Sequence, residues 1–245
     1  MCPRPSTFKL PCTKHPEILW NTMEPNKTFH GTLVASGTRP ANGRERATPT
    51  IEENLLQPDD DKIERIARKF SDIMEILGLD LNDDSLKDTP RRVAKMYVLE
   101  QFAGLNPLNK PEVTLFENRY QYGEMILERN ITLHSTCEHH FVPILGVCHV
   151  AYFSSGEVVG LSKLNRLVRY FAKRPQVQER LTEQIAAELK KVLKTEDVAV
   201  YLDAEHLCVK MRGVEDAHSS TVTSHFSGKF KETGARAEFM QAIKA

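Results

Sequence analysis

Hydrophobic residues recur at steps of three and four along several stretches of the chain, which is the spacing of amphipathic helices. In the clearest stretch they follow Asp59-Asp60-Asp61, whose carboxylates suit the positive end of a helix dipole, and the pattern closes at Gly78. Thr89 followed by Pro90 marks a second start, because threonine caps helices and proline fits the first turn. The predicted helices begin at Asp59, Thr89, Ser162, Pro175 and about Ala235.

Between these helices, β-branched and aromatic residues are frequent, and such segments favour strands. Strands are predicted over residues 113–116, 125–132, 142–153, 197–202 and 206–211. In the last of these, polar and apolar residues alternate strictly, so one strand face would carry only polar side chains. Those side chains are His206, Cys208, Lys210 and Arg212. Helices and strands in this order predict an α+β fold, with helices packed on one face of an antiparallel sheet.

The first 50 residues show neither period for long, and they hold seven of the 13 prolines. We predict a flexible or disordered arm over residues 1–55, a helical region over residues 56–110 and the α+β domain over residues 111–245. The alternative for the arm is an organelle-targeting or regulatory segment, although Glu17 and Glu24 are unusual in a transit peptide.

The charge balance and the cysteines restrict the classes of function. Lysine and arginine together number 33, as do aspartate and glutamate, so the net charge is zero and no nucleic-acid partner is expected. A small anion would have to meet a local cluster of basic residues. The chain has neither a run of about 18 apolar residues nor an apolar segment directly after Met1, so neither a membrane span nor a secretory signal is predicted. Five sparse cysteines, an odd number, favour a reducing compartment, and we expect a cytoplasmic protein.

The densest chemical motif is Cys137-Glu138-His139-His140. A thiolate and an imidazole this close in sequence can hold one ion, and Zn²⁺ prefers sulfur and nitrogen donors. The motif alone would also fit a core thiol followed by two surface histidines. Cys208, on the polar strand face, supplies a third donor and leaves a fourth position for water, as in catalytic zinc sites.

The spacing does not decide whether His139 or His140 binds the metal. The histidine left over, together with His206, would be free for proton transfer, because an unligated imidazole titrates near neutral pH. Cys148 competes as a ligand, but it lies in an apolar predicted strand and is assigned to the core.

Two predicted helix starts carry residues suited to an anion or a base. Ser162, Lys163 and Arg166 bring a hydroxyl and two cations to the beginning of one helix, where free N–H groups hold phosphates. A solvated helix start is the alternative. Gln178 and Glu179 lie in the first turn of the next helix. The carboxylate of Glu179 either completes the capping chemistry or accepts two N–H bonds from a guanine-like edge.

Four motifs stand together in one order, namely Cys137–His140, Gly160–Arg166, Arg174–Arg180 and His206–Gly213. In this order they resemble GTP cyclohydrolase I over about three quarters of the chain, and Asp88–Ala94 resembles a fifth motif of that family. The resemblance implies a tunnelling fold, an antiparallel sheet with packed helices that assembles into a barrel, here as a toroidal homodecamer. It implies hydrolytic opening of the imidazole ring of GTP, release of formate and rearrangement to 7,8-dihydroneopterin triphosphate. That reaction is the first step of tetrahydrofolate or tetrahydrobiopterin biosynthesis.

The resemblance also implies a role for each candidate residue. The implied zinc ligands are Cys137, His140 and Cys208. The implied catalytic residues are His139, His206 and Ser162. The implied substrate contacts are Gln178, Glu179, Lys163, Arg166, Arg212 and Arg92, of which Arg92 would come from a neighbouring subunit.

In the implied scheme, zinc activates the water that attacks C8 of the purine, and His206 protonates N7. His139 contacts the ribose oxygen during ring opening. Glu179 holds the guanine edge beside backbone groups near Gln178, and the basic side chains meet the triphosphate. Ser162 serves phosphate binding and the later rearrangement of the opened ribose.

Two other functions are alternatives to this one: a zinc-stabilised GTP-binding regulator without turnover, and another pterin enzyme of the tunnelling fold. Pyruvoyl-tetrahydropterin synthases resemble this fold but hold zinc with three histidines, so two cysteines argue against them. The presence of both His139 and His206 argues against a regulator. Residues 1–50 match no motif of the family, and the feedback control of its animal members is not carried over.

Overall fold

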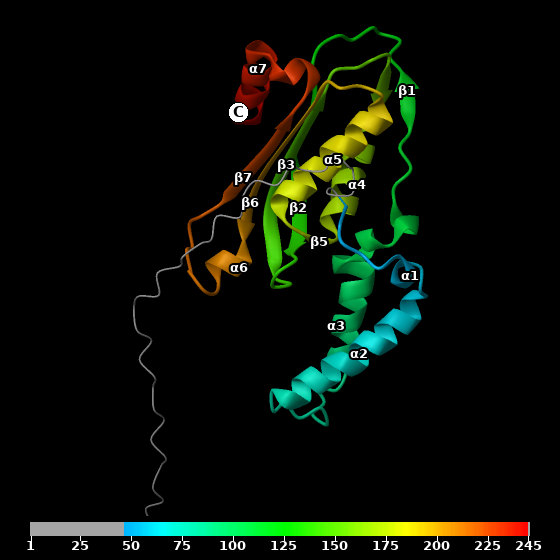
Figure 1. Ribbon diagram of the computed structural model, residues 1–245, viewed down its shortest axis with the longest axis vertical. Helices are drawn as coiled ribbons and strands as arrows, with labels where there is room; N and C mark the ends of the chain where they lie inside the picture. The colour runs from blue at the N-terminus through cyan, green and yellow to red at the C-terminus, as the bar shows by residue number, and fades with distance from the viewer. Residues whose placement is uncertain (1–46, 245) are drawn as a thin grey trace, which may run out of the picture. The chain divides into compact units, whose positions relative to one another are not determined.

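The computed structural model describes residues 47–244, which begin with a set of helices (Figure 1). The predicted arm lies outside the described residues, except for residues 47–55. The helices of this first part are α1 (Glu52–Leu55), α2 (Asp59–Ile76), α3 (Thr89–Lys95), the π-helical η2 (Met96–Gln101) and the 3₁₀ turns η3 (Ala103–Leu105) and η4 (Pro107–Asn109). The predicted first helix is confirmed by α2, which holds all three aspartates in its first turn.

The second part is built on a five-stranded sheet in the order β5-β2-β3-β6-β7. Its strands are β2 (Ile126–Cys137), β3 (Pro143–Tyr152), β5 (Pro175–Gln176), β6 (Val198–His206) and β7 (Thr221–Phe226). Neighbours are antiparallel except β5, which runs parallel to β2. A separate pair joins β1 (Leu115–Glu117) to β4 (Glu157–Val159). The helices are α4 (Leu161–Ala172), α5 (Gln178–Leu193), α6 (Leu207–Lys210), η5 (Gly228–Lys231) and α7 (Thr233–Lys244). Within residues 47–244, no helix is both long and apolar enough to span a bilayer.

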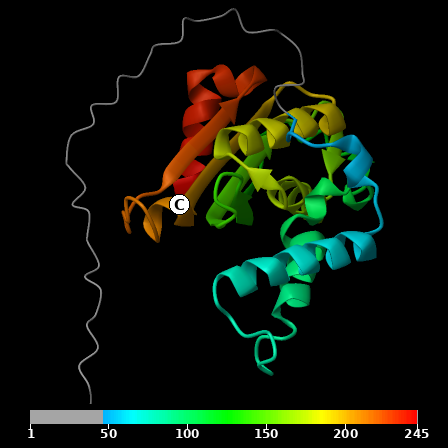
Figure 2. The same cartoon turned by 60° about the horizontal axis from the view of Figure 1, so that its bottom comes forward.

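Helices cover both faces of the sheet, so the prediction of a single covered face is correct only in part. The inward stripes of α4 and α5 are buried against one face, as expected. On the other face lies α7, drawn in red in Figure 2. Its Phe239 belongs to an apolar cluster with Ala151 of β3, Phe153 directly after β3 and Ala199 of β6. Ala151 and Ala199 alternate along their strands with residues of the core under α4 and α5. This end of the sheet is therefore apolar on both faces, and each face must be covered by helices. The α+β class itself is confirmed.

Three predicted helix starts are displaced. The capping position before α3 belongs to Asp88, because Thr89 is already helical. The capping position before α4 belongs to Gly160, and Ser162 lies inside the first turn. Pro175 does not open α5, because it pairs with β2 as the first residue of β5.

The predicted strand over residues 206–211 is wrong. The last residue of β6, His206, pairs with Ile144, and β3 offers only one more residue beyond it, Pro143, which has no N–H to donate. With no partner strand left, the chain turns into α6. The side chains expected on one strand face therefore come from a strand end, a helical turn and the following loop: His206, Cys208, Lys210 and Arg212.

Candidate metal centre and active site

Two thiols and one imidazole converge at the end of the sheet where β2 and β6 finish. One ligand atom each from Cys137, His140 and Cys208 lies within 4.8 Å of the other two. The Cys137 Sγ and His140 Nδ1 atoms are 3.9 Å apart. Donors about 2.0–2.3 Å from a tetrahedral zinc ion lie roughly 3.5 Å from one another, so this donor set fits such an ion with a small adjustment. The group includes His140 and not His139, which spacing could not decide.

The loop that carries two of these donors is held by its own backbone. The Cys137 N–H donates to the Val142 carbonyl at 2.9 Å, and the Phe141 N–H donates to the Cys137 carbonyl at 2.9 Å. Phe141 has φ of 55°, a left-handed conformation that closes the turn directly after His140. The sequence therefore places a thiol and an imidazole on one tight turn at the end of β2.

An ion pair fastens the same loop to the start of α5. The Glu138 carboxylate accepts from the guanidinium of Arg180, whose side chain is 11% exposed. Arg180 also donates to the Pro175 carbonyl at 3.0 Å and to Gln176 Oε1 at 3.1 Å, while the Glu138 N–H donates to the Gln176 carbonyl at 3.0 Å. The short β5 thus connects the donor loop with α5. Sequence reasoning missed this role of Glu138 and Arg180, because their contact depends on the parallel pairing of β5 with β2.

Candidate proton-transfer and base-binding residues lie beside the donor set. His206 Nε2 is 2.7 Å from Gln178 Oε1, and burial lowers the pKa of His206 while the nearby Glu179 carboxylate raises it. Arg212 Nη1 lies 3.0 Å from His140 Nε2. His139 is exposed, with Nδ1 3.9 Å from Cys137 Sγ.

The three cysteines of the described residues differ in environment. Cys148 is fully buried in the apolar core, as predicted, and burial raises the pKa of its thiol far above the ordinary value. Burial also raises the pKa of the Cys208 thiol, and its contact with Cys137 adds to the shift. A metal cation bound to Cys208 would act against this shift, because a thiol binds metal as its thiolate.

The predicted anion-binding residues lie away from this group. Ser162, Lys163 and Arg166 occupy the N-terminal turns of α4. The other end of α4 is tied to β2 close to the donor set, because the Ala172 carbonyl accepts from Ser135 Oγ, two residues before Cys137, at 2.8 Å. At 1.5 Å per residue, Ser162 lies about 15 Å along the helix from that contact.

Arg92 also lies apart from the donor set. It is exposed on α3, with Nη2 3.7 Å from the Asp88 carboxylate. The structure therefore brings together within one chain the donor set, both candidate histidines and the start of α5, but neither Arg92 nor the cations of α4.

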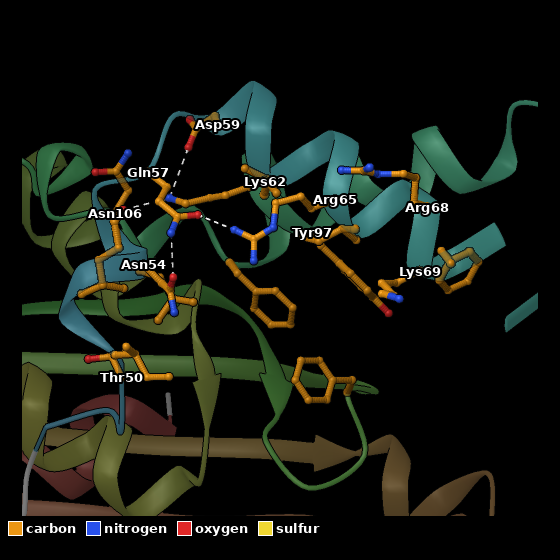
Figure 3. A pocket seen from close by; sticks show the side chains of 18 of the residues that line it. Thr50, Asn54, Gln57, Asp59, Lys62, Arg65, Arg68, Lys69, Tyr97 and Asn106 are labelled. Carbon is orange, nitrogen blue, oxygen red and sulfur yellow. Dashed lines mark hydrogen bonds and ion pairs between the residues drawn. The ribbon is translucent and has the colours of Figure 1, made fainter. Parts of the chain in front are cut away.

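A large cavity of about 960 Å³ lies next to the donor loop rather than at it. Its apolar wall includes Tyr97, Phe102 and Phe141, whose rings pack with centroids 5.3–6.4 Å apart. Figure 3 shows basic side chains along α2 on one side of the cavity: Lys62, Arg65, Arg68 and Lys69. Phe141 lines the cavity and directly follows His140 in the chain, but none of Cys137, His140 and Cys208 lines it.

Comparison with known proteins gives the same answer as the motifs. The sequence model of the family described as GTP cyclohydrolase I matches residues 66–244. The chain belongs to the GTP cyclohydrolase I family. Curated relatives named GTP cyclohydrolase 1 include those of Flavobacterium johnsoniae, 60% identical, Haemophilus ducreyi, 52% identical, and Vibrio cholerae, 51% identical. These alignments cover 79–80% of this chain and 88–89% of the relatives.

Membership of the GTP cyclohydrolase I family makes this chain an enzyme and not merely a binding protein. The matched region contains the donor set, α4 and the start of α5, whereas residues 1–65 precede it. The resemblance drawn from the four motifs is thus confirmed at the level of the family.

Proposed function

We propose that this chain opens the imidazole ring of GTP by hydrolysis, releases formate and forms 7,8-dihydroneopterin triphosphate, with one zinc ion per subunit. One observation carries the proposal: a Cys–His–Cys donor set lies beside a half-buried histidine and a carboxylate in a chain of this family. Ring opening needs a nucleophile, a proton donor and a group that recognises guanine, and these residues offer all three.

Zinc is the proposed ion because two thiols and an imidazole are donors that it prefers. Cys137, His140 and Cys208 would hold it and leave one position free. Bound in this way, it would lower the pKa of a coordinated water to about 7 and supply a nucleophile at neutral pH.

The proposed roles of the neighbouring side chains follow from their surroundings. Burial lowers the pKa of His206 more than the Glu179 carboxylate raises it, and an imidazole held beside that carboxylate would serve as the proton donor to N7. His139, exposed beside the donor loop, would contact the ribose oxygen. Arg212, whose Nη1 lies 3.0 Å from His140 Nε2, would contact the triphosphate of the substrate.

The remaining substrate contacts are proposed to come from another copy of the chain. Because Ser162 lies about 15 Å along α4 from the site, the phosphate-binding turn of α4 would serve the site of a neighbour. We propose the same for Arg92. The site would then be completed in a homo-oligomer, a decamer according to the resemblance, and the sheet edges would close a barrel as in the tunnelling fold.

Purified protein loaded with zinc should convert GTP. Formate and the dihydropterin, the latter followed by its absorbance, should form in equal molar amounts. A chelator should stop both signals and added zinc should restore them. The reason is that no side chain of the donor set could replace the metal in activating water. Binding of zinc and GTP without formate would instead support the non-catalytic regulator. Equal turnover of ATP would exclude guanine recognition.

The change Glu179→Gln should reduce discrimination between GTP and ATP more than it reduces affinity for the triphosphate. A carboxylate that accepts two N–H bonds from guanine contributes about 1.5–3 kcal/mol, so the preference for GTP should fall roughly 10- to 100-fold. Competition between the two nucleotides in a binding assay measures it. Glu238→Gln, the same change at an exposed position of α7, serves as the control. An unaltered preference in Glu179→Gln would refute the assignment.

A further inference from the structure

A closed ring of hydrogen bonds lies directly behind His206. Gln178 Nε2 donates to Thr223 Oγ1 at 3.2 Å, the hydroxyls of Thr223 and Thr182 are 2.7 Å apart, and Thr182 Oγ1 donates to the Gln178 carbonyl at 2.9 Å. The ring joins the first turn of α5 to the edge strand β7. Gln178 and Thr182 are each only 2% exposed, so no water competes for these groups.

The direction of every bond in the ring is fixed by counting hydrogens. Each hydroxyl has one hydrogen, and Thr182 uses its own for the Gln178 carbonyl, so it must accept from Thr223. Thr223 has then spent its hydrogen and must accept from the Gln178 amide. The second hydrogen of that amide points to the Thr221 carbonyl at 2.8 Å, with the Leu202 carbonyl of β6 more distant at 3.4 Å. The NH₂ group therefore faces acceptors of β7 and β6 only.

This arrangement leaves only one orientation for the other half of the amide. Gln178 Oε1 faces His206 Nε2 at 2.7 Å, and an amide oxygen can only accept. His206 must then carry its hydrogen on Nε2, which leaves Nδ1 as the ring nitrogen that Gln178 does not engage. A rotated amide would instead set its oxygen against the Thr221 carbonyl and leave a buried NH₂ facing the imidazole.

We propose that Thr182 and Thr223 are positioning residues of this enzyme, which act through Gln178 to fix the ring orientation and tautomer of His206. The proposal rests on the proposed role of His206 in proton transfer. Neither threonine touches the donor set or the substrate, so each would affect the rate of the chemical step and not the binding of GTP.

The test compares Thr223→Val, which keeps the shape and loses the hydroxyl, with Thr223→Ser, which keeps the hydroxyl. In Thr223→Val, kcat should fall about 10-fold, part of the roughly 10²–10⁴ that acid–base catalysis contributes, with KM for GTP changed less than about twofold. Thr223→Ser should retain the parent kcat. Thr182→Val and Thr182→Ser should repeat the pattern, which guards against a folding defect in one variant. Ser224→Ala, exposed on the opposite face of β7, should behave as the parent.

Two further measurements separate positioning from a general loss of stability. In a Gln178→Ala background, Thr223→Val should cost nothing more, because the path to His206 is already cut. An equal cost in both backgrounds would overturn the proposal, as would equal kcat for the Val and Ser variants.

A third measurement is independent of turnover. The ring-nitrogen NMR shifts of His206, identified by their absence in His206→Ala, should show hydrogen on Nε2 in the zinc-loaded parent and a tautomer mixture in Thr223→Val. Unchanged shifts in Thr223→Val would refute this positioning role, whether or not the parent releases formate. A parent that releases no formate would refute the proposed function, but not the positioning of His206.

Discussion

Replacing Cys208 with alanine should empty the metal site and stop formate release. Two donors would be left, both on the loop after β2, and the link to α6 would be lost. Loss of several kcal/mol of transition-state stabilisation by the metal corresponds to a fall in kcat of roughly a thousand-fold or more. Metal analysis and the formate assay on the same preparation measure both effects.

The matched control for Cys208→Ala is Cys148→Ala, which removes a thiol from the apolar core of β3. That variant should keep its zinc and its turnover while the free energy of unfolding falls by about 1 kcal/mol, since a small cavity replaces the sulfur. Full activity in metal-free Cys208→Ala would show that the ligand assignment is wrong.

Replacing His206 with alanine should leave zinc and GTP bound while kcat falls by about 10²–10⁴, the usual contribution of a positioned acid or base. The side chain contacts Gln178 and is not part of the donor set, so its removal should not empty the metal site. Zinc content, GTP binding and formate release measured together separate this result from that of Cys208→Ala.

His134→Ala provides the comparison for His206→Ala, since His134 is exposed on β2, the strand that leads into the donor loop. It should match the parent in all three measurements. Loss of zinc from His206→Ala, or unchanged turnover, would show that His206 is not the proton-transfer group.

The sequence predicts best those elements whose signal is local. In α2, apolar residues repeat at helical spacing over many residues and three aspartates mark the start, so the sequence predicts a helix there. The observed bounds agree with the predicted ones within about two residues. The edge strand β7 was not predicted, although its threonines, valine and phenylalanine favour strands, because the segment is only six residues long and its partner β6 lies about 20 positions earlier. The alternation after His206 misled because a strand also needs a partner, and β3 has ended there.

The same distinction applies to the site. Cys137 and His140 lie in one four-residue motif and could be paired from the sequence, whereas the placing of Cys208 beside them depends on the register of β3 and β6. The ring through Thr182 and Thr223 has no sequence signal, because it joins α5 to β7 through buried hydroxyls. The separation of Ser162 from the donor set follows from the direction of α4, which the order of the motifs does not contain.

The distribution of the proposed metal ligands along the chain also implies an order of events during synthesis. The ribosome makes Cys137 and His140 early, and β3, α4, α5 and β6 must follow before Cys208 appears. Until β6 has paired with β3, a nascent chain offers an ion only two donors on one loop. The proposed zinc ion would therefore be acquired after the sheet has formed, and a chain whose β6 is misaligned would lack the third donor.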